Sequence, residues 1–324
     1  MQEGTRACGN ESIESWHLSR FLMEGGSIVA GALAPHPPHL VYAENPPQNE
    51  PSSEGGWEML RWGYERMRGD LSRLEYDVII VLSAHWQTYV GNHILNVPHF
   101  ESLSVDPVFP HLFRYHYSID VDCELAQAIH AEAQEAGLVT QLMNNPDYRV
   151  DYGTIVSCHM TDPEWTRPIV SISSFRSNAY YSTDVMQEQM LALGKATRAA
   201  IESTGRRALL LASNSLSHRH FVTEHDIPED MSKEHIISHP QHLWDVRMIE
   251  MIRRGELQRV LDEMPEFAEQ SVSEVDSGGL SWLIGALGVD AGPGELYGYG
   301  TVIGTGNAVI GWLIGDSSET EGAE

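Results

Sequence analysis

Residues 27–40 read "SIVAGALAPHPPHL", an apolar run that ends in two histidines set among prolines. Residues 78–85, "VIIVLSAH", repeat this arrangement, and residues 208–218, "ALLLASNSLSH", repeat it again. Short apolar runs with little polar alternation are typical of strands buried on both faces of a sheet. The three stretches therefore predict a buried sheet with a histidine at or just beyond the end of each of three strands.

Helical patterns separate these runs. Apolar side chains recur at helical spacing in residues 58–74, 185–205 and 242–255. The last two stretches end in Gly205 and Gly255, and glycine is a common residue at the C-terminal end of a helix. Strands that alternate with helices indicate an α/β fold in which helices cover a central sheet.

The remaining segments fit one domain. Residues 167–173 and 301–313 add two strand-like runs, and residues 91–125 predict a long connection or a β-rich excursion near the site. No internal repeat is present. We expect one catalytic domain over residues 24–313, preceded by an extension of residues 1–23 and followed by an acidic tail of residues 314–324.

The composition argues against several classes of partner. The chain of 324 residues has a formal net charge of −26, with 20 Lys plus Arg against 46 Asp plus Glu. Nucleic-acid binding needs clustered basic side chains, so we expect no nucleic-acid partner. No stretch reaches the roughly 18 uncharged apolar residues that cross a membrane, and the N-terminus lacks a secretory signal. The three cysteines form no disulfide framework, which predicts a reducing, cytoplasmic location.

Three histidines are candidates for a shared site. Ligands of open α/β sheets bind beyond the carboxyl ends of the strands, where His36, His85 and His218 are expected. Pro35 and Pro37 fix the backbone on either side of His36, which reduces the entropy lost when a metal binds. We therefore expect at least two of the histidines to share a site, with His36 and His85 holding a metal ion.

A carboxylate is expected from the acidic stretch "PEFAEQSVSEVDSGGLSW". Two histidines and one carboxylate suit Fe(II) and leave positions open for substrate and O₂. If this stretch is a helix, Glu274 lies on the same face as Phe267, where a buried carboxylate needs a partner such as a metal. The spacing favours Glu274 only weakly over Asp276, and the stretch also contains Glu266 and Glu269.

Other residues have simpler interpretations. Tyr152, in "VDYGT", could orient a phenolic substrate, but the spacing favours a buried tyrosine with a satisfied hydroxyl group. Ser215 and Ser217 lie near His218, but no G-x-S-x-G elbow supports a serine hydrolase. The histidines of residues 234–242, "EHIISHPQH", read as part of a solvated segment. The glycines of "GYGTVIGTGNAV" read as tight turns between strands rather than as a dinucleotide site.

Several motifs together resemble one known family. "APHPPHL", "SAHW", "FRYHYSIDVD", "VDYGT", "SNSLSH" and "GYGTVIGTGNAV" are similar to motifs of the class III extradiol dioxygenases of the LigB type. Within that family they are most similar to the catalytic β subunits of 2-aminophenol dioxygenases. The resemblance covers residues 24–313. It implies a single α/β domain with a central mixed sheet flanked by helices.

The resemblance also implies a role for each candidate. His36 and His85 match the two histidine ligands of Fe(II), and Glu274 matches the carboxylate ligand. His218 matches the catalytic acid/base. Tyr152 matches a residue that orients the substrate through a hydrogen bond, which differs from the interpretation of Tyr152 from spacing alone.

The implied activity is that of a non-haem Fe(II)-dependent extradiol dioxygenase. It would open a 2-aminophenol with both atoms of O₂ to a 2-aminomuconate semialdehyde. The alternatives are an extradiol dioxygenase acting on a catechol or a substituted aminophenol, a zinc hydrolase with the same ligands, and a non-catalytic scaffold subunit. The resemblance further implies a related α subunit as partner, or self-association.

Overall fold

The structure is a computed structural model that describes residues 25–42, 56–107, 110, 113–175, 181–219, 238–302 and 304–314. The strands are β1 (Ser27–Leu33), β2 (Val78–Thr88), β3 (Asn92–Leu95), β4 (His99–Val105), β5 (Arg114–Asp120), β6 (Thr140–Met143), β7 (Ile169–Phe175), β8 (Arg207–Ser213), β9 (Glu295–Val302) and β10 (Thr305–Leu313). The α-helices are α2 (Gly56–Leu71), α3 (Cys123–Glu135), α4 (Tyr152–Thr161), α5 (Thr183–Thr204), α6 (His239–Arg253), α7 (Leu257–Ser271) and α8 (Gly278–Leu287). Two short 3-10 helices are η2 (Pro38–Tyr42) and η4 (Glu274–Ser277).

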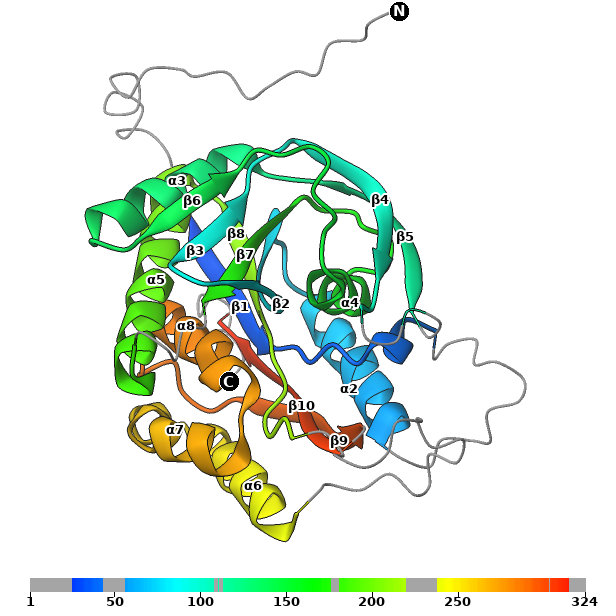
Figure 1. Cartoon of the computed structure of the whole chain (residues 1–324), viewed down its shortest axis with the longest axis vertical. Coiled ribbons are helices and arrows are strands. Elements are labelled where there is room, and N and C mark those ends of the chain that lie inside the picture. Colours follow the sequence, from blue (N-terminus) through cyan, green and yellow to red (C-terminus); the bar gives the residue numbers. More distant parts are fainter. Residues whose placement is uncertain are drawn as a thin grey trace, which may run out of the picture.

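Eight strands form one mixed sheet in the order β6-β3-β7-β2-β8-β1-β10-β9 (Figure 1). The four central strands, β7, β2, β8 and β1, are parallel to their neighbours within this group, so their carboxyl ends lie at one edge. β10 pairs antiparallel with β1 and with β9, and β3 pairs antiparallel with β7. The mixed sheet with flanking helices confirms the predicted fold class.

Side chains of the central strands alternate between two apolar cores. Val78, Ile80 and Leu82 contact a core formed with α3, α5, α6, α7 and α8. Ile79 and Val81 contact a second core formed with α2, α4 and the two-stranded sheet β4-β5. Since successive residues of a strand point to opposite faces, a continuous apolar run is needed to fill both cores. The helices therefore cover both faces of the sheet, as Figure 1 shows.

The predicted elements compare closely with the observed ones. α2, α5 and α6 form where helical spacing was found, and Gly205 and Gly255 follow α5 and α6 with φ of 69° and 71°. Residues 91–125 include β3, β4 and β5, which confirms a β-rich excursion. Residues 301–313 were predicted to form one strand, but they belong to two. Residues 301–302 end β9, β10 begins at Thr305, and the two strands pair antiparallel.

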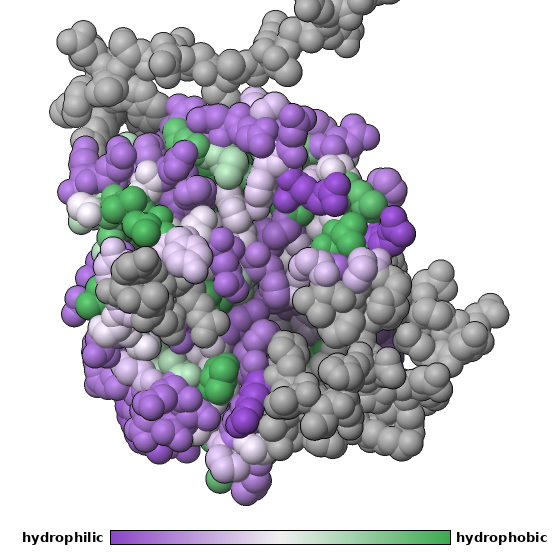
Figure 2. Space-filling model, viewed as in Figure 1, coloured by the Kyte–Doolittle hydropathy of each residue, from purple (hydrophilic) through white to green (hydrophobic). Residues whose placement is uncertain are grey.

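The surface and the ends of the chain add little to the site. The face shown in Figure 2 is mostly hydrophilic, with hydrophobic residues in small separate groups. Among the described helices, none is long and apolar enough to cross a bilayer. Cys123 and Cys158 are buried, and neither is in a disulfide among the described residues. Residues 1–24 and 315–324 lie outside the described residues, so the predicted extension and tail stay predictions.

Candidate metal centre

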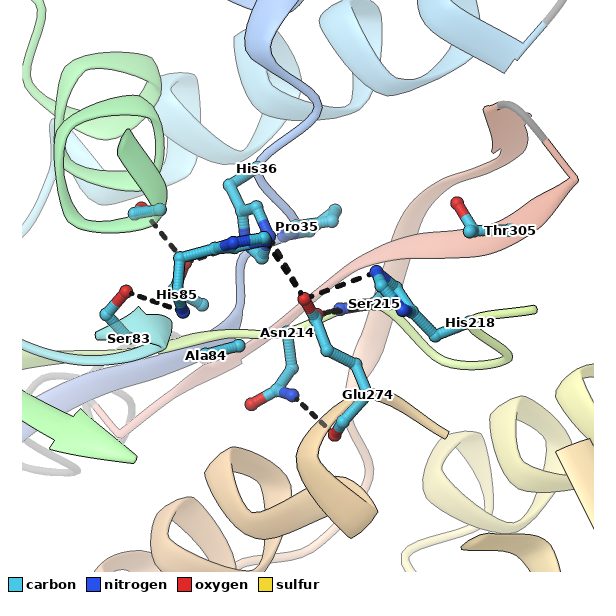
Figure 3. Close-up of polar contacts among 12 residues, drawn as sticks. Pro35, His36, Ser83, Ala84, His85, Asn214, Ser215, His218, Glu274 and Thr305 are labelled. Atoms are coloured by element: carbon cyan, nitrogen blue, oxygen red, sulfur yellow. Dashed lines mark hydrogen bonds and ion pairs between the residues drawn. The ribbon is translucent and has the colours of Figure 1, made fainter. Parts of the chain in front are cut away.

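His36 and His85 meet at the carboxyl ends of β1 and β2. The strand between these two in the sheet is β8, which is parallel to both. His36 lies shortly after β1, beyond Ala34 and Pro35, and His85 lies late in β2, where the pairing with β7 shifts between Ser83 and Gln87. The two imidazole rings are 4.6 Å apart and nearly perpendicular (Figure 3). The sequence prediction that these histidines share a site therefore agrees with the geometry.

Glu274 completes a group of three potential metal ligands. Its Oε1 lies 3.3 Å from Nε2 of His36 and 3.3 Å from Nε2 of His85. The ligand atoms of the three residues all lie within 4.8 Å of one another, and all three side chains are at least partly buried. Two metal–ligand bonds of about 2.1 Å at a right angle place their ligand atoms about 3 Å apart, close to the observed spacing.

Ser213 fixes the orientation and the tautomer of His36. The Ser213 Oγ lies 2.8 Å from Nδ1 of His36 and 2.9 Å from the carbonyl oxygen of Gly153. A carbonyl oxygen can only accept, so the single hydroxyl proton of Ser213 is donated to Gly153. Nδ1 of His36 must then donate to Ser213, which leaves the lone pair of Nε2 directed at Glu274.

Glu274 does not lie on one helix with Phe267, so that prediction is wrong. α7 ends at Ser271, and Val272 follows in a left-handed conformation with φ of 50°. Glu274 begins η4, in which Val275 and the residue after it also have positive φ, 46° and 51°. The side chain of Glu274 therefore reaches the histidines from a strained turn, and helical periodicity cannot describe its direction.

Hydrogen bonds hold the carboxylate of Glu274 through its second oxygen. The backbone N–H of Ser215 donates to Oε2 over 2.6 Å, and the Ser215 hydroxyl donates to the same atom over 3.1 Å. The side-chain amide of Asn214 donates to the carbonyl oxygen of Glu274 over 3.0 Å. These contacts leave Oε1 directed toward the imidazoles (Figure 3).

The imidazoles keep this buried carboxylate ionised. Burial acts to raise the pKa of Glu274, but the charges of His36 and His218 and hydrogen bonds with His36 and His85 outweigh it and hold that pKa well below its usual range. Glu274 is only 4% exposed, so solvent screens these interactions weakly. The group therefore offers an anionic oxygen at neutral pH.

His218 approaches the carboxylate from the other side. Its Nε2 lies 3.4 Å from Oε1 of Glu274, and Figure 3 shows it opposite His36 and His85. It is not one of the three residues whose ligand atoms lie within 4.8 Å of one another. Its side chain is 26% exposed, compared with 7% for His36. His218 is thus near enough to exchange a proton with a molecule bound beside the three-residue group.

Tyr152 lies at the start of α4 with its hydroxyl group against His85. The hydroxyl oxygen is 2.8 Å from Nε2 of His85. Burial raises the pKa of Tyr152 well above its usual value, and the negative charges of Asp106, Glu274 and Asp151 raise it further. The phenol therefore stays protonated, and it donates to Nε2 of His85 or accepts from it according to the tautomer of that imidazole. Tyr152 is buried with a satisfied hydroxyl group, as spacing suggested, and it also borders the site.

The serines of "SNSLSH" have a role that sequence reasoning missed. The sequence suggested these serines only as candidate nucleophiles. In the structure they form hydrogen bonds with polar groups in and around the site: Ser213 binds His36, Ser215 binds Glu274, and Ser217 binds Asp245. Residues two positions apart in an extended chain point to the same side. The alternation of serine at every second position was therefore the signal that could have revealed them.

The donor set fits a divalent cation such as Fe(II). When neutral, the imidazoles of His36 and His85 can each present a lone pair on Nε2. Both Nε2 atoms lie 3.3 Å from the ionised oxygen of Glu274. Without metal, positive charge and hydrogen bonds of the imidazoles stabilise that oxygen, and a divalent cation bound among the three atoms can take over this role. Two neutral imidazoles and one carboxylate are also the ligand types that suit Fe(II).

Comparison with known proteins identifies the family. The family model described as the catalytic LigB subunit of aromatic ring-opening dioxygenases matches residues 30–310. The chain belongs to the LigB family. The matched stretch contains His36, His85, His218 and Glu274, and it runs from β1 to β10. Membership of this family of catalytic subunits confirms the predicted resemblance.

Three curated relatives span nearly the whole LigB domain. The 2-aminophenol 1,6-dioxygenase beta subunit of a Pseudomonas species is 53% identical over 292 residues, which are 90% of this chain and 96% of that protein. The 3,4-dihydroxyphenylacetate 2,3-dioxygenase of Escherichia coli is 26% identical, covering 84% of this chain and 94% of that protein. The 2-aminophenol 1,6-dioxygenase alpha subunit of a Pseudomonas species is 22% identical, covering 80% and 92%.

A solved structure supports the fold. A crystal structure of an uncharacterized protein from Escherichia coli K12 superposes with a TM-score of 0.57 at 13% sequence identity. The superposition covers 87% of this chain and 99% of that chain. At this level of identity the similarity shows that the α/β architecture is shared.

The other candidate residues do not join the LigB site. Glu266 and Glu269 are exposed on α7. His239 is exposed at the start of α6, and Nδ1 of His242 lies 3.3 Å from the Tyr299 hydroxyl oxygen. His235 lies outside the described residues.

Proposed function

We propose that this chain is a non-haem Fe(II)-dependent extradiol dioxygenase that opens the ring of a 2-aminophenol. Both atoms of O₂ enter the product, a 2-aminomuconate semialdehyde, and the ring opens beside the two substituents rather than between them. The observation that carries this proposal is the convergence of Nε2 of His36, Nε2 of His85 and Oε1 of Glu274. Family membership places that geometry in a ring-opening enzyme.

The three converging residues would hold the iron. His36, His85 and Glu274 offer three ligand atoms within 4.8 Å of one another, and such a set leaves other positions open for substrate and O₂. Bound Fe(II) supplies the transfer of electron density from the aromatic ring to O₂. Ser213 and Ser215 bind the outward atoms of His36 and Glu274, so the inward atoms keep their direction before metal arrives.

His218 would act as the acid/base. Its Nε2 is 3.4 Å from Oε1 of Glu274, so it lies beside any substrate bound next to the three ligands. A neutral imidazole there can accept the proton of the substrate hydroxyl group. The resulting imidazolium can return that proton to oxygen later in the reaction. General acid–base catalysis of this kind contributes roughly 10²- to 10⁴-fold to a rate.

Tyr152 would orient the substrate. Its phenol stays protonated, and the hydroxyl oxygen lies 2.8 Å from Nε2 of His85. If a metal occupied the lone pair of that nitrogen, the Tyr152 hydroxyl group would no longer bond to it and could donate to a bound substrate instead. A catechol offers two oxygen acceptors, and a 2-aminophenol offers one oxygen and one nitrogen.

The choice of 2-aminophenol rests on similarity. The relative that is 53% identical is named as a 2-aminophenol 1,6-dioxygenase beta subunit. The relative that is 26% identical is named as a dioxygenase of 3,4-dihydroxyphenylacetate, a catechol. The higher identity favours an aminophenol over a catechol. The same names support a partner related to the alpha subunit, itself 22% identical to this chain.

O₂ uptake by anaerobically Fe(II)-loaded protein tests the function. We expect faster uptake with 2-aminophenol than with catechol, and a roughly 10²- to 10⁴-fold loss in His218→Ala at unchanged iron content. The assay is run with the chain alone and with a co-expressed related subunit. Uptake with catechol only would refute the aminophenol assignment.

Two variants separate the alternative functions. His36→Ala should lose both iron and turnover in an enzyme, whereas a scaffold subunit would assemble and support its partner as before. Zn(II)-loaded protein should be inactive, because ring opening needs a metal that can pass electrons to O₂. Hydrolytic activity that depends on zinc would replace the dioxygenase proposal.

A further inference from the structure

Asp245, on α6, is a buried carboxylate that the proposed reaction does not use. Its side chain is 0% exposed, and three donors satisfy it. The backbone N–H of Ser217 donates to Oδ1 over 2.9 Å, and the Ser217 hydroxyl group donates to Oδ2 over 2.7 Å. The hydroxyl group of Tyr299, on β9, donates to Oδ2 over 2.9 Å. Two of the three donors thus belong to the residue directly before His218.

The segment that carries His218 is fixed on both sides by backbone contacts. The carbonyl oxygen of Ser217 accepts from the N–H of Gly306 over 2.9 Å, and the N–H of Leu216 donates to the carbonyl oxygen of Gly306 over 2.8 Å. The N–H of His218 donates to the carbonyl oxygen of Ser271 over 3.4 Å. Asp245 adds the only side-chain acceptor that Ser217 has among the described contacts.

Gly306 shows how closely Asp245 approaches this segment. A Cβ atom at position 306 would lie 1.8 Å from Oδ2 of Asp245 and 2.8 Å from Oγ of Ser217. No side chain can occupy that space, so glycine is required at this position. This explains one glycine of the motif near the C-terminus. Because Gly306 has no side chain, the carboxylate of Asp245 can approach the segment that carries His218.

We propose that Asp245 is a positioning residue that holds Ser217, and through it His218, in the place needed for proton transfer. Asp245 touches neither substrate nor metal ligand in this arrangement. The inference rests on the proposed function, because it concerns the acid/base of that reaction. It adds a carboxylate on α6 to a site otherwise built from the strand ends and η4.

The chemistry of the three donors explains why a carboxylate is needed. An ionised carboxylate accepts the N–H and both hydroxyl groups at once, whereas asparagine offers one accepting oxygen and directs an NH₂ group at the other two partners. Asp245→Asn should therefore keep the bond to the Ser217 N–H and disturb the bonds to the Ser217 and Tyr299 hydroxyl groups. Asp245→Ala should lose all three bonds.

A double-mutant cycle distinguishes positioning from general destabilisation. We expect Asp245→Ala to lower kcat roughly 10- to 100-fold, the scale of a misplacement of about 1 Å, with a smaller change in KM. Asp245→Asn should fold readily and lose less. In the His218→Ala background, Asp245→Ala should cause no further loss, because the two residues act through one group. The matched control is Asp162→Asn, which alters another buried aspartate, at the far end of α4, and should leave kcat unchanged.

Two further measurements do not depend on turnover. Backbone amide hydrogen exchange of residues 214–219 should quicken in Asp245→Ala and remain slow in Asp162→Asn. The affinity for Fe(II), measured anaerobically by competition with a chelator, should not change, because Asp245 contacts no proposed ligand. Faster exchange with unchanged affinity, together with the non-additive cycle, supports the proposal.

Three outcomes would overturn it. Equal losses from Asp245→Ala in the wild-type and His218→Ala backgrounds would mean a general structural role. Unchanged exchange in residues 214–219 would mean that Asp245 does not hold the segment. An unchanged kcat despite faster exchange would mean that His218 needs no such support. If wild-type protein opens no ring, the proposed function fails, whereas the exchange result still decides whether Asp245 holds the segment.

Discussion

At the scale of single residues, two of the three proposed metal ligands, His36 and Glu274, are held by serines at the end of β8. Each is held through the atom that faces away from the proposed metal. Nδ1 of His36 binds Ser213, and Oε2 of Glu274 binds Ser215. The inward atoms, Nε2 and Oε1, therefore keep one direction. Both serines come from the end of β8, the strand between the two that carry the histidines.

Ser213→Ala should weaken metal binding. The substitution removes the acceptor of Nδ1 of His36, so the ring can rotate and the tautomer with a lone pair on Nε2 is no longer favoured. We expect a roughly 10- to 100-fold higher Kd for Fe(II), as is typical for lost partners of metal ligands. Chelator competition measures the Kd. Ser171→Ala, which alters a buried serine on β7 that is bonded to Thr154, should leave it unchanged, and equal effects of both variants would contradict the assignment.

The residues of the site were only partly predictable. His36 and His85 could be found because each follows a run of apolar residues, and parallel strands bring such ends together. Glu274 could not be assigned from spacing, because its direction depends on left-handed residues that no periodicity describes. Asp245 gave no signal at all, since one aspartate in an amphipathic helix resembles any exposed one.

At the scale of elements, the segment between α7 and α8 carries unusual backbone strain. Val272, Val275, Asp276 and Ser277 all have φ between 46° and 58°. Non-glycine residues in this region cost about 1–3 kcal/mol each, more for branched side chains. The surrounding contacts therefore stabilise a conformation that places Glu274 between two such residues.

Val272→Gly should stabilise the protein. Val272 is 44% exposed and ends α7 with φ of 50°, so glycine removes strain without removing a buried side chain. We expect the free energy of unfolding to rise by about 1 kcal/mol. Urea denaturation measures it. Val272→Ala is the matched control, since alanine removes the side-chain methyl groups but keeps the Cβ, and an equal gain from both variants would argue against backbone strain.

Gly279→Ala should disturb the support of Glu274. A Cβ at position 279 would lie 1.8 Å from Oδ1 of Asn214, whose amide group donates to the Glu274 carbonyl oxygen. We expect a loss of stability of about 1–3 kcal/mol and weaker Fe(II) binding. The neighbouring Gly278→Ala is the control, because its Cβ would meet only Met190 Cγ at 3.5 Å. Equal losses in both variants would show that helix propensity, rather than contact with Asn214, decides the effect.

The elements themselves were more predictable than the site. The run through Ile79 and Val81 fills two cores at once, so its lack of alternation identified a central strand. α5 was delimited by helical spacing and by Gly205, which has a left-handed φ of 69°. The order of strands was not readable from composition or spacing. It depends on which crossovers pack, and family resemblance rather than periodicity indicated a mixed sheet.

At the scale of the whole molecule, the site joins parts of the chain that are distant in sequence. His36 and His85 come from the N-terminal part of the chain, and Glu274 follows α7 near the C-terminal end. A metal bound to all three residues links these parts in the folded state only. Metal binding and folding are therefore coupled, and bound Fe(II) should raise the free energy of unfolding by about 2.7 kcal/mol at a hundredfold excess over Kd.

Asp245 gives the global stability a specific dependence on pH. Burial raises its pKa to about 6, and hydrogen bonds from Ser217 and Tyr299 oppose that rise only in part. The ordinary value is about 3.9, so the folded protein binds a proton at Asp245 more tightly than the unfolded chain does. This contribution to stability is complete below about pH 4 and is lost as the pH rises through about 6.

Asp245→Asn should remove this dependence, because an amide does not titrate. The difference in unfolding free energy, wild type minus variant, should fall by about 2–3 kcal/mol between pH 4 and pH 7. Taking the difference cancels the titration of groups that both proteins share, and chelator-treated protein removes the contribution of bound metal. Urea denaturation at pH 4, 5, 6 and 7 measures it. A difference that stays constant across these values would mean that folding does not raise the pKa of Asp245, and that its three donors fully compensate the cost of its burial.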